Sequence, residues 1–499
     1  MIREETMKKK SSKDSLGGDA VTLTASKIIN LIITMITSML LARYRTIEEY
    51  GTYSQLLLVV NLVSALLMLG LPNSINYFYV RAETQQEKQR FLSVYYTLNT
   101  LLSVIMGIVL VLSVPLIEMY FHNEVIRQFY YFLALYPWAS VINSSIENVL
   151  IVSKHVSFLM VFRMIYSAAM LGSVLLVQWL GYGFEIYMQW FVVINCVFSV
   201  FVYLIVAKLS NGIKFIWDIV WIRAIFKFSI PIGLATAVGT LNAEIDKLLI
   251  GYLMDTETLA IYTNAARELP LSIVASSITA VLIPRVTTLV KHKKTKEAIN
   301  LWGYSIEFTL LFIVFVVAGV FVYAEEVMTI LYSAKYLSGV WVFRVYSLNL
   351  LLRCTYFGMI LNAYGETKKI LYCSIGSLIL NVILNPLCYW MFGMIGPAIA
   401  TFIAIFLIML LQLGMTIKVA SVRFRNLFPW KRLFTVVCVN FSLSLCFWGI
   451  KIVCPLDKHI GSLLEAVVCG ILWMIIYFMV MRKKFIYTWN RMNQKEETI

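Results

Sequence analysis

Long, uninterrupted apolar stretches separated by short polar connections limit what this chain can fold into. A membrane-spanning helix needs about 20 consecutive apolar residues, and roughly fourteen such stretches follow one another here. The stretches are continuous and do not alternate, which predicts helices and excludes a transmembrane β-barrel. The predicted spans lie at about 20–42, 54–80, 92–117, 128–152, 164–181, 187–207, 228–251, 260–287, 301–324, 340–364, 370–392, 396–417, 432–452 and 461–481.

The composition agrees with a membrane protein. Of the 499 residues, 60% are hydrophobic and 14% are charged, whereas about 25% of the residues of a soluble protein are charged. A soluble enzyme, a disulfide-rich secreted domain and a disordered chain are therefore excluded. The eight cysteines lie mostly inside apolar stretches, which indicates small buried side chains, and the four histidines have no metal-ligand spacing. We predict no catalytic residue, no metal and no cofactor.

The excess of positive charge predicts how the chain crosses the membrane. Lys and Arg number 42 against 27 acidic residues, a net charge of +15. If the N-terminus is cytoplasmic, 31 of these cations fall in inner segments and 6 in outer segments. Positive residues collect in cytoplasmic loops, so we expect both termini in the cytoplasm. The same explanation makes a nucleic-acid partner unnecessary.

A weak internal repeat predicts two lobes. Tyr50-Gly51-Thr52-Tyr53 follows the first span, and Ala260-Ile261-Tyr262 follows the seventh at an offset of about 209 residues. Six spans separate the two copies, and an even number predicts parallel repeats. We expect an all-α polytopic membrane protein with about fourteen transmembrane helices, two six-helix lobes as parallel repeats and a C-terminal helix pair. The expected parts are a cytoplasmic tail (1–19), an N-lobe (20–207), an interfacial cytoplasmic linker (208–227), a C-lobe (228–417), the helix pair (418–481) and a second cytoplasmic tail (482–499).

Polar and charged residues recur inside the first, second, seventh and eighth spans. Charges at membrane depth are costly and normally face a bundle interior or a wet cavity. On the first and seventh spans these residues recur every three or four positions, which places them on one helical face. Two lobes facing each other across these spans would enclose a polar cavity. The predicted cavity-lining, substrate-binding residues are Lys27, Asn30, Asn76, Thr240, Glu244, Asp246, Lys247, Asn264, Arg267 and Glu268.

A structural interpretation of these charges stays open. Glu244 and Lys247 are three residues apart and suit a local ion pair, and Asp246, Glu268 and Arg267 suit a structural network near the outer surface. For Glu147, Glu307 and Arg353, which lie inside other predicted spans, we favour a structural or conformational role over contact with a substrate. The cations, in contrast, suit an anionic substrate such as a phosphate or diphosphate.

Short outer loops restrict the classes of function further. The longest predicted outer loop has roughly 15 residues, and no Gly-x-x-x-x-Gly-Lys-Ser/Thr phosphate loop occurs. An attached ATPase is therefore excluded. Membrane-embedded polymerases and glycosyltransferases are disfavoured, because they usually need a sizeable outer loop to hold their catalytic groups.

Several motifs, taken in order, resemble the bacterial polysaccharide or O-antigen-type oligosaccharide flippases. This family belongs to the multidrug/oligosaccharidyl-lipid/polysaccharide exporter superfamily. The resemblance covers about residues 20–418, and one departure is Ala260, where the family usually has Gly. The final helix pair matches no motif; in the related lipid II flippases an extra C-terminal pair borders a groove for the lipid tail. The motifs are Leu41-Ala42-Arg43, Tyr50-Gly51-x-Tyr53, Leu69-Gly70-Leu71-Pro72, Asp246, Ile250-Gly251, Tyr262, Pro284, Asn362-Ala363-Tyr364-Gly365, Asn381, Asn385-Pro386 and Gly393-x-x-Gly396-Pro397-Ala398-Ile399-Ala400-Thr401.

The resemblance implies a function that is not enzymatic. The implied protein is a flippase of the bacterial inner membrane that moves a polyprenyl-diphosphate-linked oligosaccharide (an O-antigen, capsule or exopolysaccharide repeat unit) between leaflets by alternating access. Its implied partners are this substrate, membrane lipids, H⁺ or Na⁺ as a coupling ion, and polysaccharide assembly proteins. Two alternatives stay open. One is a drug/cation antiporter of the same superfamily, which the acids Glu244, Asp246 and Glu268 would suit, and the other is a membrane-embedded repeat-unit polymerase or ligase.

Overall fold

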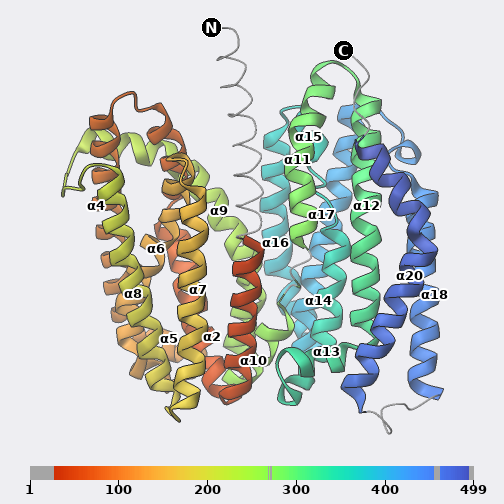
Figure 1. Ribbon diagram of the computed structural model, residues 1–499, viewed down its shortest axis with the longest axis horizontal. Helices are drawn as coiled ribbons and strands as arrows, with labels where there is room; N and C mark the ends of the chain where they lie inside the picture. The colour runs from red at the N-terminus through yellow and green to blue at the C-terminus, as the bar shows by residue number, and fades with distance from the viewer. Residues whose placement is uncertain (1–26, 268, 270–271, 454–460, 494–499) are drawn as a thin grey trace. The chain divides into compact units, whose positions relative to one another are not determined.

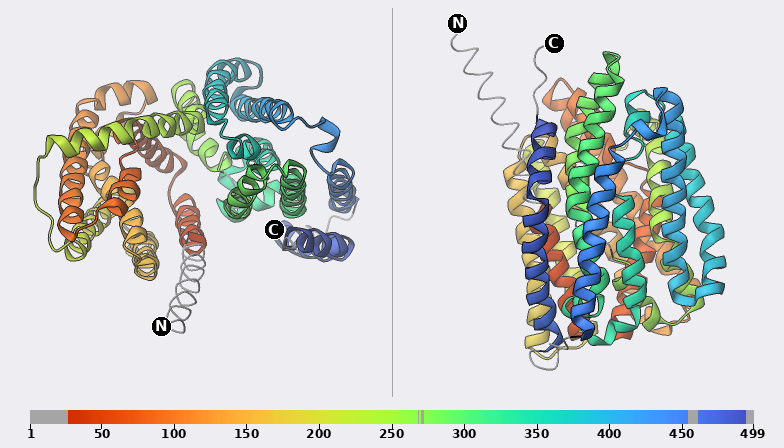
Figure 2. Two further views of the ribbon diagram at one scale, coloured as in Figure 1. Left: turned by 90° about the horizontal axis from the view of Figure 1, so that it is seen from above. Right: turned by 90° about the vertical axis from the view of Figure 1, so that its right-hand side faces the viewer.

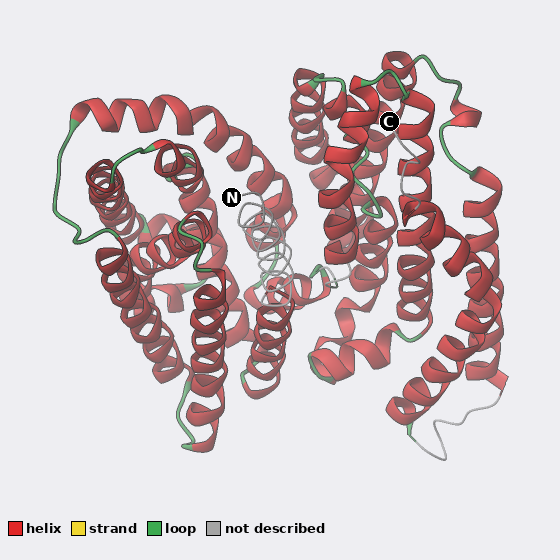
Figure 3. Ribbon diagram, turned by 45° about the horizontal axis from the view of Figure 1, so that its top comes forward, coloured by secondary structure: helices red, strands yellow, loops and turns green. Residues whose placement is uncertain are grey.

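The fold is all-α, as predicted. The computed structural model describes residues 27–267, 269, 272–453 and 461–493, and no β-strand occurs among them (Figures 1 and 3). Ten described segments have the length and hydropathy to span a membrane, and one of them, Thr367–Ala420, contains two successive helices. The chain is therefore a multi-pass membrane protein. The number fourteen stays a prediction.

The first half of the chain alternates long helices with short helical turns. A first described helix covers Lys27–Tyr44. The long helices that follow are α2 (Ile47–Leu67), α4 (Gln85–Leu112), α6 (Tyr130–Val152), α7 (Val156–Trp179), α8 (Phe184–Leu209) and α9 (Ile219–Leu253). The short elements are α3 (Pro72–Ser74), a π-helical turn (Ile75–Tyr79), α5 (Val114–Phe121) and a 3₁₀ turn (Glu124–Phe129).

The second half has the same alternation and ends in two further long helices. The long helices are α11 (Ser272–Lys291), α12 (Thr295–Val322), α14 (Val340–Leu352), α16 (Thr367–Phe392), α17 (Gly396–Ala420), α18 (Trp430–Val453) and α20 (Ser462–Asn493). The shorter ones are α10 (Thr256–Ala265), α13 (Ala324–Leu331), α15 (Met359–Ala363) and 3₁₀ turns at Ala334–Gly339, Gly393–Ile395 and Phe424–Asn426. The helix α20 continues to Asn493, into the residues predicted as the C-terminal tail.

Local sequence explains where several helices begin. Thr46 and Thr84 each form a capping box, in which the threonine hydroxyl accepts from the backbone N–H three residues on and a glutamate there accepts from the threonine N–H. The helix α9 begins after Asp218, whose carboxylate accepts from two backbone N–H groups of its first turn and pairs with Arg90 at 2.6 Å. These caps satisfy backbone donors that the first turn of a helix leaves without partners.

The order of elements recurs at a nearly constant offset, which supports the predicted repeat. The helix α2 begins 209 residues before α10, α4 begins 210 before α12, and α5 begins 210 before α13. The two longer 3₁₀ turns, and the helices α6 and α14 that follow them, are also 210 residues apart. The helices α18 and α20 come after the last repeated element, where the C-terminal helix pair was expected.

The chain folds into two compact units. Unit 1 contains residues 1–244 and 251–260, and unit 2 contains 245–250 and 261–499. The division runs through α9 and α10, so the residues predicted as a linker, 208–227, belong to unit 1 together with most of α9. In unit 1, α6 packs against both α4 and α8 (Figure 1).

Glycine lets two backbones approach closely in unit 1. After α2 the chain turns at Leu69 and Gly70, which both have positive φ (43° and 71°), and this turn lies against α9 at Gly233. A Cβ atom added at Gly233 would lie 2.0 Å from the carbonyl carbon of Leu69. Only glycine fits at this contact, because any side chain would push the turn away from the helix.

Two ion clusters join the C-terminal helices to the rest of unit 2. The helices α18 and α20 run beside α12 (Figures 1 and 2). In the first cluster the carboxylate of the buried Glu307 of α12 lies 3.5 Å from the guanidinium of Arg432 of α18. In the second cluster the carboxylate of Glu326 of α13 lies 2.6 Å from Lys451 Nζ of α18. For Glu307, this contact fits the structural role expected from the sequence.

Candidate functional site

A polar pocket of about 300 Å³ lies inside unit 1, among helices that carry charges at membrane depth. It is formed by the first described helix and by α6, α7 and α8. Its lining combines an acid, a base, several amides and two tyrosines with apolar side chains such as Ile146 and Phe162. The lining residues are Asn30, Tyr136, Ser140, Asn143, Ser144, Ile146, Glu147, Phe162, Arg163, Tyr166 and Asn195.

One carboxylate holds two cations at this pocket. The Glu147 carboxylate lies 3.0 Å from Lys27 Nζ and also pairs with the Arg163 guanidinium. The side chains of Lys27, Glu147 and Arg163 are 51%, 30% and 18% exposed, so the cluster is open on the Lys27 side. It carries a net charge of +1. An unpaired charge at the centre of a membrane costs about 2.5–3.5 kcal/mol, and the pairing offsets part of that cost.

Amide groups form a second, neutral part of the pocket. Asn195 of α8 is buried; its Oδ1 accepts from the Tyr166 hydroxyl at 2.9 Å and its backbone carbonyl accepts from Asn143 Nδ2 at 3.1 Å. Asn30 of the first helix accepts a hydrogen bond from the Ser167 hydroxyl of α7. These bonds tie four helices together around the pocket, so its amide and hydroxyl groups are held in place before any ligand arrives.

The chemistry of this pocket suits an anion or a hydroxyl-rich group. The cluster of Lys27, Arg163 and Glu147 has two positive charges and one negative charge, so one positive charge is left over for an anion. The guanidinium of Arg163 can also bind two phosphate oxygens at once. Asparagine amides and tyrosine hydroxyls both donate and accept, as a sugar requires. Among the described residues no group of His, Cys, Asp and Glu is arranged to hold a metal ion.

The other predicted residues of unit 1 lie outside this pocket. Asn76, in the π-helical turn, donates to Asn148 Oδ1 at 3.2 Å, next to Glu147 in the sequence. The Thr240 hydroxyl donates to the backbone carbonyl of Thr236 at 3.2 Å, within α9. Glu244 is half-buried, and its contact with a substrate stays a prediction.

In unit 2 the predicted Asp246 is buried in a network of its own. Its carboxylate accepts from the Tyr262 hydroxyl at 2.9 Å, from the Tyr346 hydroxyl and from the backbone N–H of Lys247 at 2.8 Å. These partners lie on α9, α10 and α14. The carboxylate therefore connects α14 to the parts of α9 and α10 that belong to unit 2, which matches the structural interpretation that the sequence left open.

The remaining predicted residues of unit 2 differ in exposure. Asn264 is buried, Lys247 is half-buried and Arg267 is exposed. Glu268 lies outside the described residues. The role of these residues in substrate binding stays a prediction.

Comparison with known proteins places the chain in a family. Residues 40–341 match the model of a family described as polysaccharide biosynthesis protein. The chain belongs to this polysaccharide biosynthesis family. The family predicted from the motifs is thereby confirmed.

Two curated relatives are both archaeal. An uncharacterized membrane protein of Methanocaldococcus jannaschii is 27% identical over 270 residues, which are 52% of this chain and 50% of that protein. A probable low-salt glycan biosynthesis flippase of Haloferax volcanii is 21% identical over 182 residues, 36% of this chain and 39% of that protein. The chain thus spans half or less of the length of the curated relatives it matches.

Solved structures confirm the fold. The inward closed conformation of a lipid II flippase aligns with a TM-score of 0.71 and 16% identity, covering 93% of this chain and 99% of that one. An inward-facing multidrug resistance transporter, described as a member of the MOP superfamily, aligns with a TM-score of 0.62 and 15% identity, covering 81% of this chain and 98% of that one. At such identities the likeness describes the fold of this polysaccharide biosynthesis protein and not its substrate.

Arg163 lines the polar pocket but was not among the residues predicted to bind substrate. It lies just before the span predicted at 164–181, in a connection expected to be cytoplasmic, but α7 begins at Val156, so Arg163 lies two turns inside the helix. One signal was present. Arg163, Tyr166 and Ser167 stand three and four residues apart, the same helical spacing that identified the polar face of the first span.

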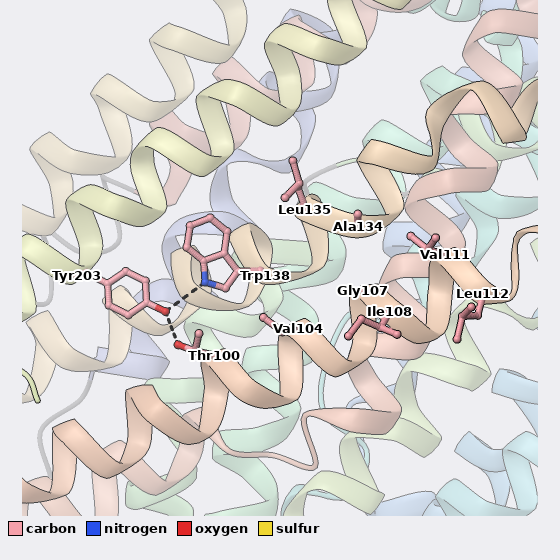
Figure 4. A pocket seen from close by; sticks show the side chains of 10 residues that line it. All are labelled: Thr100, Val104, Gly107, Ile108, Val111, Leu112, Ala134, Leu135, Trp138 and Tyr203. Atoms are coloured by element: carbon pink, nitrogen blue, oxygen red, sulfur yellow. Dashed lines mark hydrogen bonds between the residues drawn. The ribbon is translucent and has the colours of Figure 1, made fainter. Parts of the chain in front are cut away.

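A second hollow of unit 1, of about 660 Å³, is almost entirely apolar (Figure 4). It lies between α4, α6 and α8, and Figure 4 shows its polar end, where the Tyr203 hydroxyl meets Thr100 and accepts from Trp138 Nε1 at 3.2 Å. The exposed Ile108 and Leu112 at its mouth suit lipid chains. In a membrane protein of this family such a surface needs no further ligand to explain it.

Proposed function

We propose that this protein is a flippase that moves a polyprenyl-diphosphate-linked oligosaccharide across the cytoplasmic membrane. The proposed cargo is a repeat unit of a cell-surface glycan, such as an O-antigen, capsule or exopolysaccharide. The observation that carries the proposal is the family match over residues 40–341, joined to the fold of a lipid II flippase. The name of the Haloferax relative, a probable glycan biosynthesis flippase, agrees with it.

The physical problem of moving such a cargo fits the polar pocket of unit 1. A sugar cannot lose the hydration of its hydroxyl groups to hydrocarbon cheaply. Fixed amides and hydroxyls, such as those of Asn30, Asn195 and Tyr166, can replace part of that hydration. The cations Lys27 and Arg163 can stabilise the diphosphate. The polyprenyl tail stays in the bilayer throughout.

The proposed cycle is alternating access with both termini in the cytoplasm. The pocket and the cationic residues receive the headgroup from the inner leaflet and release it to the outer leaflet. The protein forms no covalent bond with the cargo, so no catalytic residue is required. H⁺ or Na⁺ is the proposed coupling ion, and polysaccharide assembly proteins are the proposed partners on each side of the membrane.

The test is to delete the gene and to find which face of the membrane holds the lipid-linked glycan. A probe that does not cross the membrane labels outward-facing units only. We expect single units to accumulate on the cytoplasmic face and the wild-type gene to restore export. Single units on the outer face would instead indicate a repeat-unit polymerase or ligase. Unchanged glycan, with lower resistance to cationic dyes, would indicate a drug/cation antiporter; a multidrug resistance transporter is among the solved structures with this fold.

Two single variants test the cations predicted in unit 2. Lys247→Ala and Arg267→Ala are each expected to abolish complementation while protein levels stay at the wild-type value, because each removes a charge proposed to stabilise the diphosphate. The exposed Arg425, replaced by Gln, is the control and should complement fully. Full activity of both alanine variants would rule out these two residues as binding groups without affecting the flippase proposal.

A further inference from the structure

A charged, open pocket of about 800 Å³ lies at one end of unit 2, and none of its lining residues was assigned above to substrate binding. It is formed by the C-terminal part of α11, the N-terminal part of α12 and the end of α20. Its lining residues are Pro284, Arg285, Thr288, Leu289, Glu297, Asn300, Leu301, Tyr304, Arg491 and Met492. The ends of these three helices lie near one another in Figure 1.

Two arginines from distant parts of the chain meet in this pocket. Arg285 Nη1 donates to the backbone carbonyl of Met492 at 3.3 Å and makes no ion pair within the described residues. Arg491 Nε donates to the Tyr487 hydroxyl at 3.3 Å. The Arg285 contact uses one nitrogen of a guanidinium that has five N–H donors. Most of the donor capacity of Arg285 is therefore available to a ligand.

The pocket is net positive and also offers neutral donors. Among the described lining residues the one acid, Glu297, lies 3.9 Å from Lys294 in an exposed pair. Three exposed cations lie where α11 meets α12: Lys291 at the end of α11, Lys293 in the turn and Lys296 in the first turn of α12. Asn300 and Tyr304 contribute an amide and a hydroxyl group to the same lining, whereas the Thr288 hydroxyl donates to the backbone carbonyl of Pro284 at 3.0 Å. This combination of guanidinium, hydroxyl and amide donors is suited to the oxygens of a phosphate group.

The place of the pocket along the helices favours a lipid over a soluble anion. The helix α11 is an apolar segment that ends at Lys291, and the charge distribution predicts that this end is cytoplasmic. The apolar half of the lining, which includes Leu289, Leu301 and Met492, can cover the first carbons of a lipid chain. Basic pockets between transmembrane helices on the cytoplasmic side are typical sites for phosphate-bearing headgroups.

We propose that this pocket binds the phosphate of a membrane lipid and thereby joins the end of α20 to α11 and α12. Two sources share this chemistry, the bulk anionic phospholipids and a polyprenyl phosphate. Because the ligand bridges helices from both ends of unit 2, its binding stabilises the docked C-terminal helix pair. The inference does not depend on transport, since it concerns a resident lipid at a site outside the polar pocket of unit 1.

The experiment measures lipid binding to the full-length protein in nanodiscs of phosphatidylcholine. Phosphatidylglycerol or polyprenyl phosphate is added in increasing amounts, and bound lipid is counted by native mass spectrometry. The double variant Arg285→Gln/Arg491→Gln should bind about thirtyfold more weakly, because each cation near a membrane surface is worth about 1 kcal/mol. Arg425→Gln, which changes an exposed arginine outside the pocket, should bind like the wild type.

A gain-of-binding variant guards against a double variant that fails to fold. Glu297→Gln removes the one acid of the lining and should tighten binding several-fold while raising the unfolding midpoint in the presence of the lipid.

Binding of both phosphate lipids supports recognition of the phosphate itself, and binding of polyprenyl phosphate alone supports the same site with the polyprenyl lipid as its source. Equal retention of phosphatidylcholine, or binding that is unchanged in all these variants, would overturn the proposal. A flippase assay on the same variants shows separately whether transport is affected.

Discussion

At the scale of single residues, the most informative contact is the one between Glu147 and two cations. Glu147→Gln leaves Lys27 and Arg163 side by side without a counter-charge. Because all three side chains are partly exposed, the expected loss of stability is small, about 1 kcal/mol. Transport should fall about tenfold, since the positions of both cations depend on this carboxylate. Thermal unfolding and complementation measure the two effects, with the exposed Glu185→Gln as the control.

A double variant separates a structural role of this cluster from a binding role. The double variant Glu147→Gln/Arg163→Gln removes both charges of the Glu147–Arg163 pair. Only the charge of the exposed Lys27 then remains in the cluster. If the cluster only holds helices together, the double variant should regain the activity that the single variant loses, because the unbalanced charge is gone. We expect stability to return and transport to stay low. Recovery of transport would show that Arg163 does not bind the cargo.

Asp246 leads to the opposite expectation, a large effect on stability. Asp246→Ala removes the acceptor of two tyrosine hydroxyls and one backbone N–H in the buried part of unit 2. Each buried group left without a partner costs about 1–3 kcal/mol. Asp246→Asn keeps one acceptor oxygen, and tyrosine hydroxyls can rotate to accept from its amide, so it should be milder. Unfolding midpoints should rank wild type, Asn, then Ala, and equal midpoints for all three would contradict the network. The exposed Glu257→Ala serves as the control.

At the scale of helices, two glycines of α9 provide a matched comparison. Gly233→Ala would place a methyl group 2.0 Å from the backbone of Leu69, whereas an added Cβ at Gly239 meets no atom within 4 Å. Gly233→Ala should therefore displace the turn after α2 and destabilise unit 1. Gly239→Ala should be neutral or stabilising by up to about 1 kcal/mol, because alanine is the better helix former. Thermal unfolding in detergent measures the change in stability of each variant. If both variants were destabilised, or neither was, the close packing of Gly233 against Leu69 would be contradicted.

The helices also show what could and could not be predicted from the sequence. Hydropathy and charge bias predicted the all-α membrane fold, and two short motifs predicted a repeat of about 209 residues, close to the observed offsets of α4 and α12. Apolar periodicity cannot reveal which side chains meet. The pairing of Lys27 with Glu147 joins helices 120 residues apart, and Arg163 looked like a cytoplasmic cation because the two turns of α7 before it were assigned to a loop. Asp246 was predicted as polar but not as enclosed by Tyr346, which follows it by 100 residues.

At the scale of the whole molecule, the two units carry their polar groups in different ways. In unit 1 the charges Lys27, Glu147 and Arg163 border a pocket and remain partly exposed. In unit 2 the carboxylates of Asp246, Glu307 and Glu326 are buried against partners that fasten helices to one another. Unit 1 is therefore the better candidate for contact with a polar headgroup, and the buried groups of unit 2 are better explained by the stability of its helix packing.

The proposed direction of transport leads to a prediction for the molecule as a whole. A diphosphate cargo carries negative charge outward, and an inside-negative membrane potential favours this movement by about 2.3 kcal/mol per charge per 100 mV. In proteoliposomes with a potassium gradient and valinomycin, export of a fluorescent polyprenyl-diphosphate sugar should accelerate when the side of the protein's termini is negative and slow when the polarity is reversed. Vesicles with gradients of H⁺ or Na⁺ but no potential separate this effect from ion coupling. A rate that follows an ion gradient and ignores the potential would mean that the cargo's charge is balanced by a co-moving cation, and the residues to replace next would then be Glu147 and Glu244.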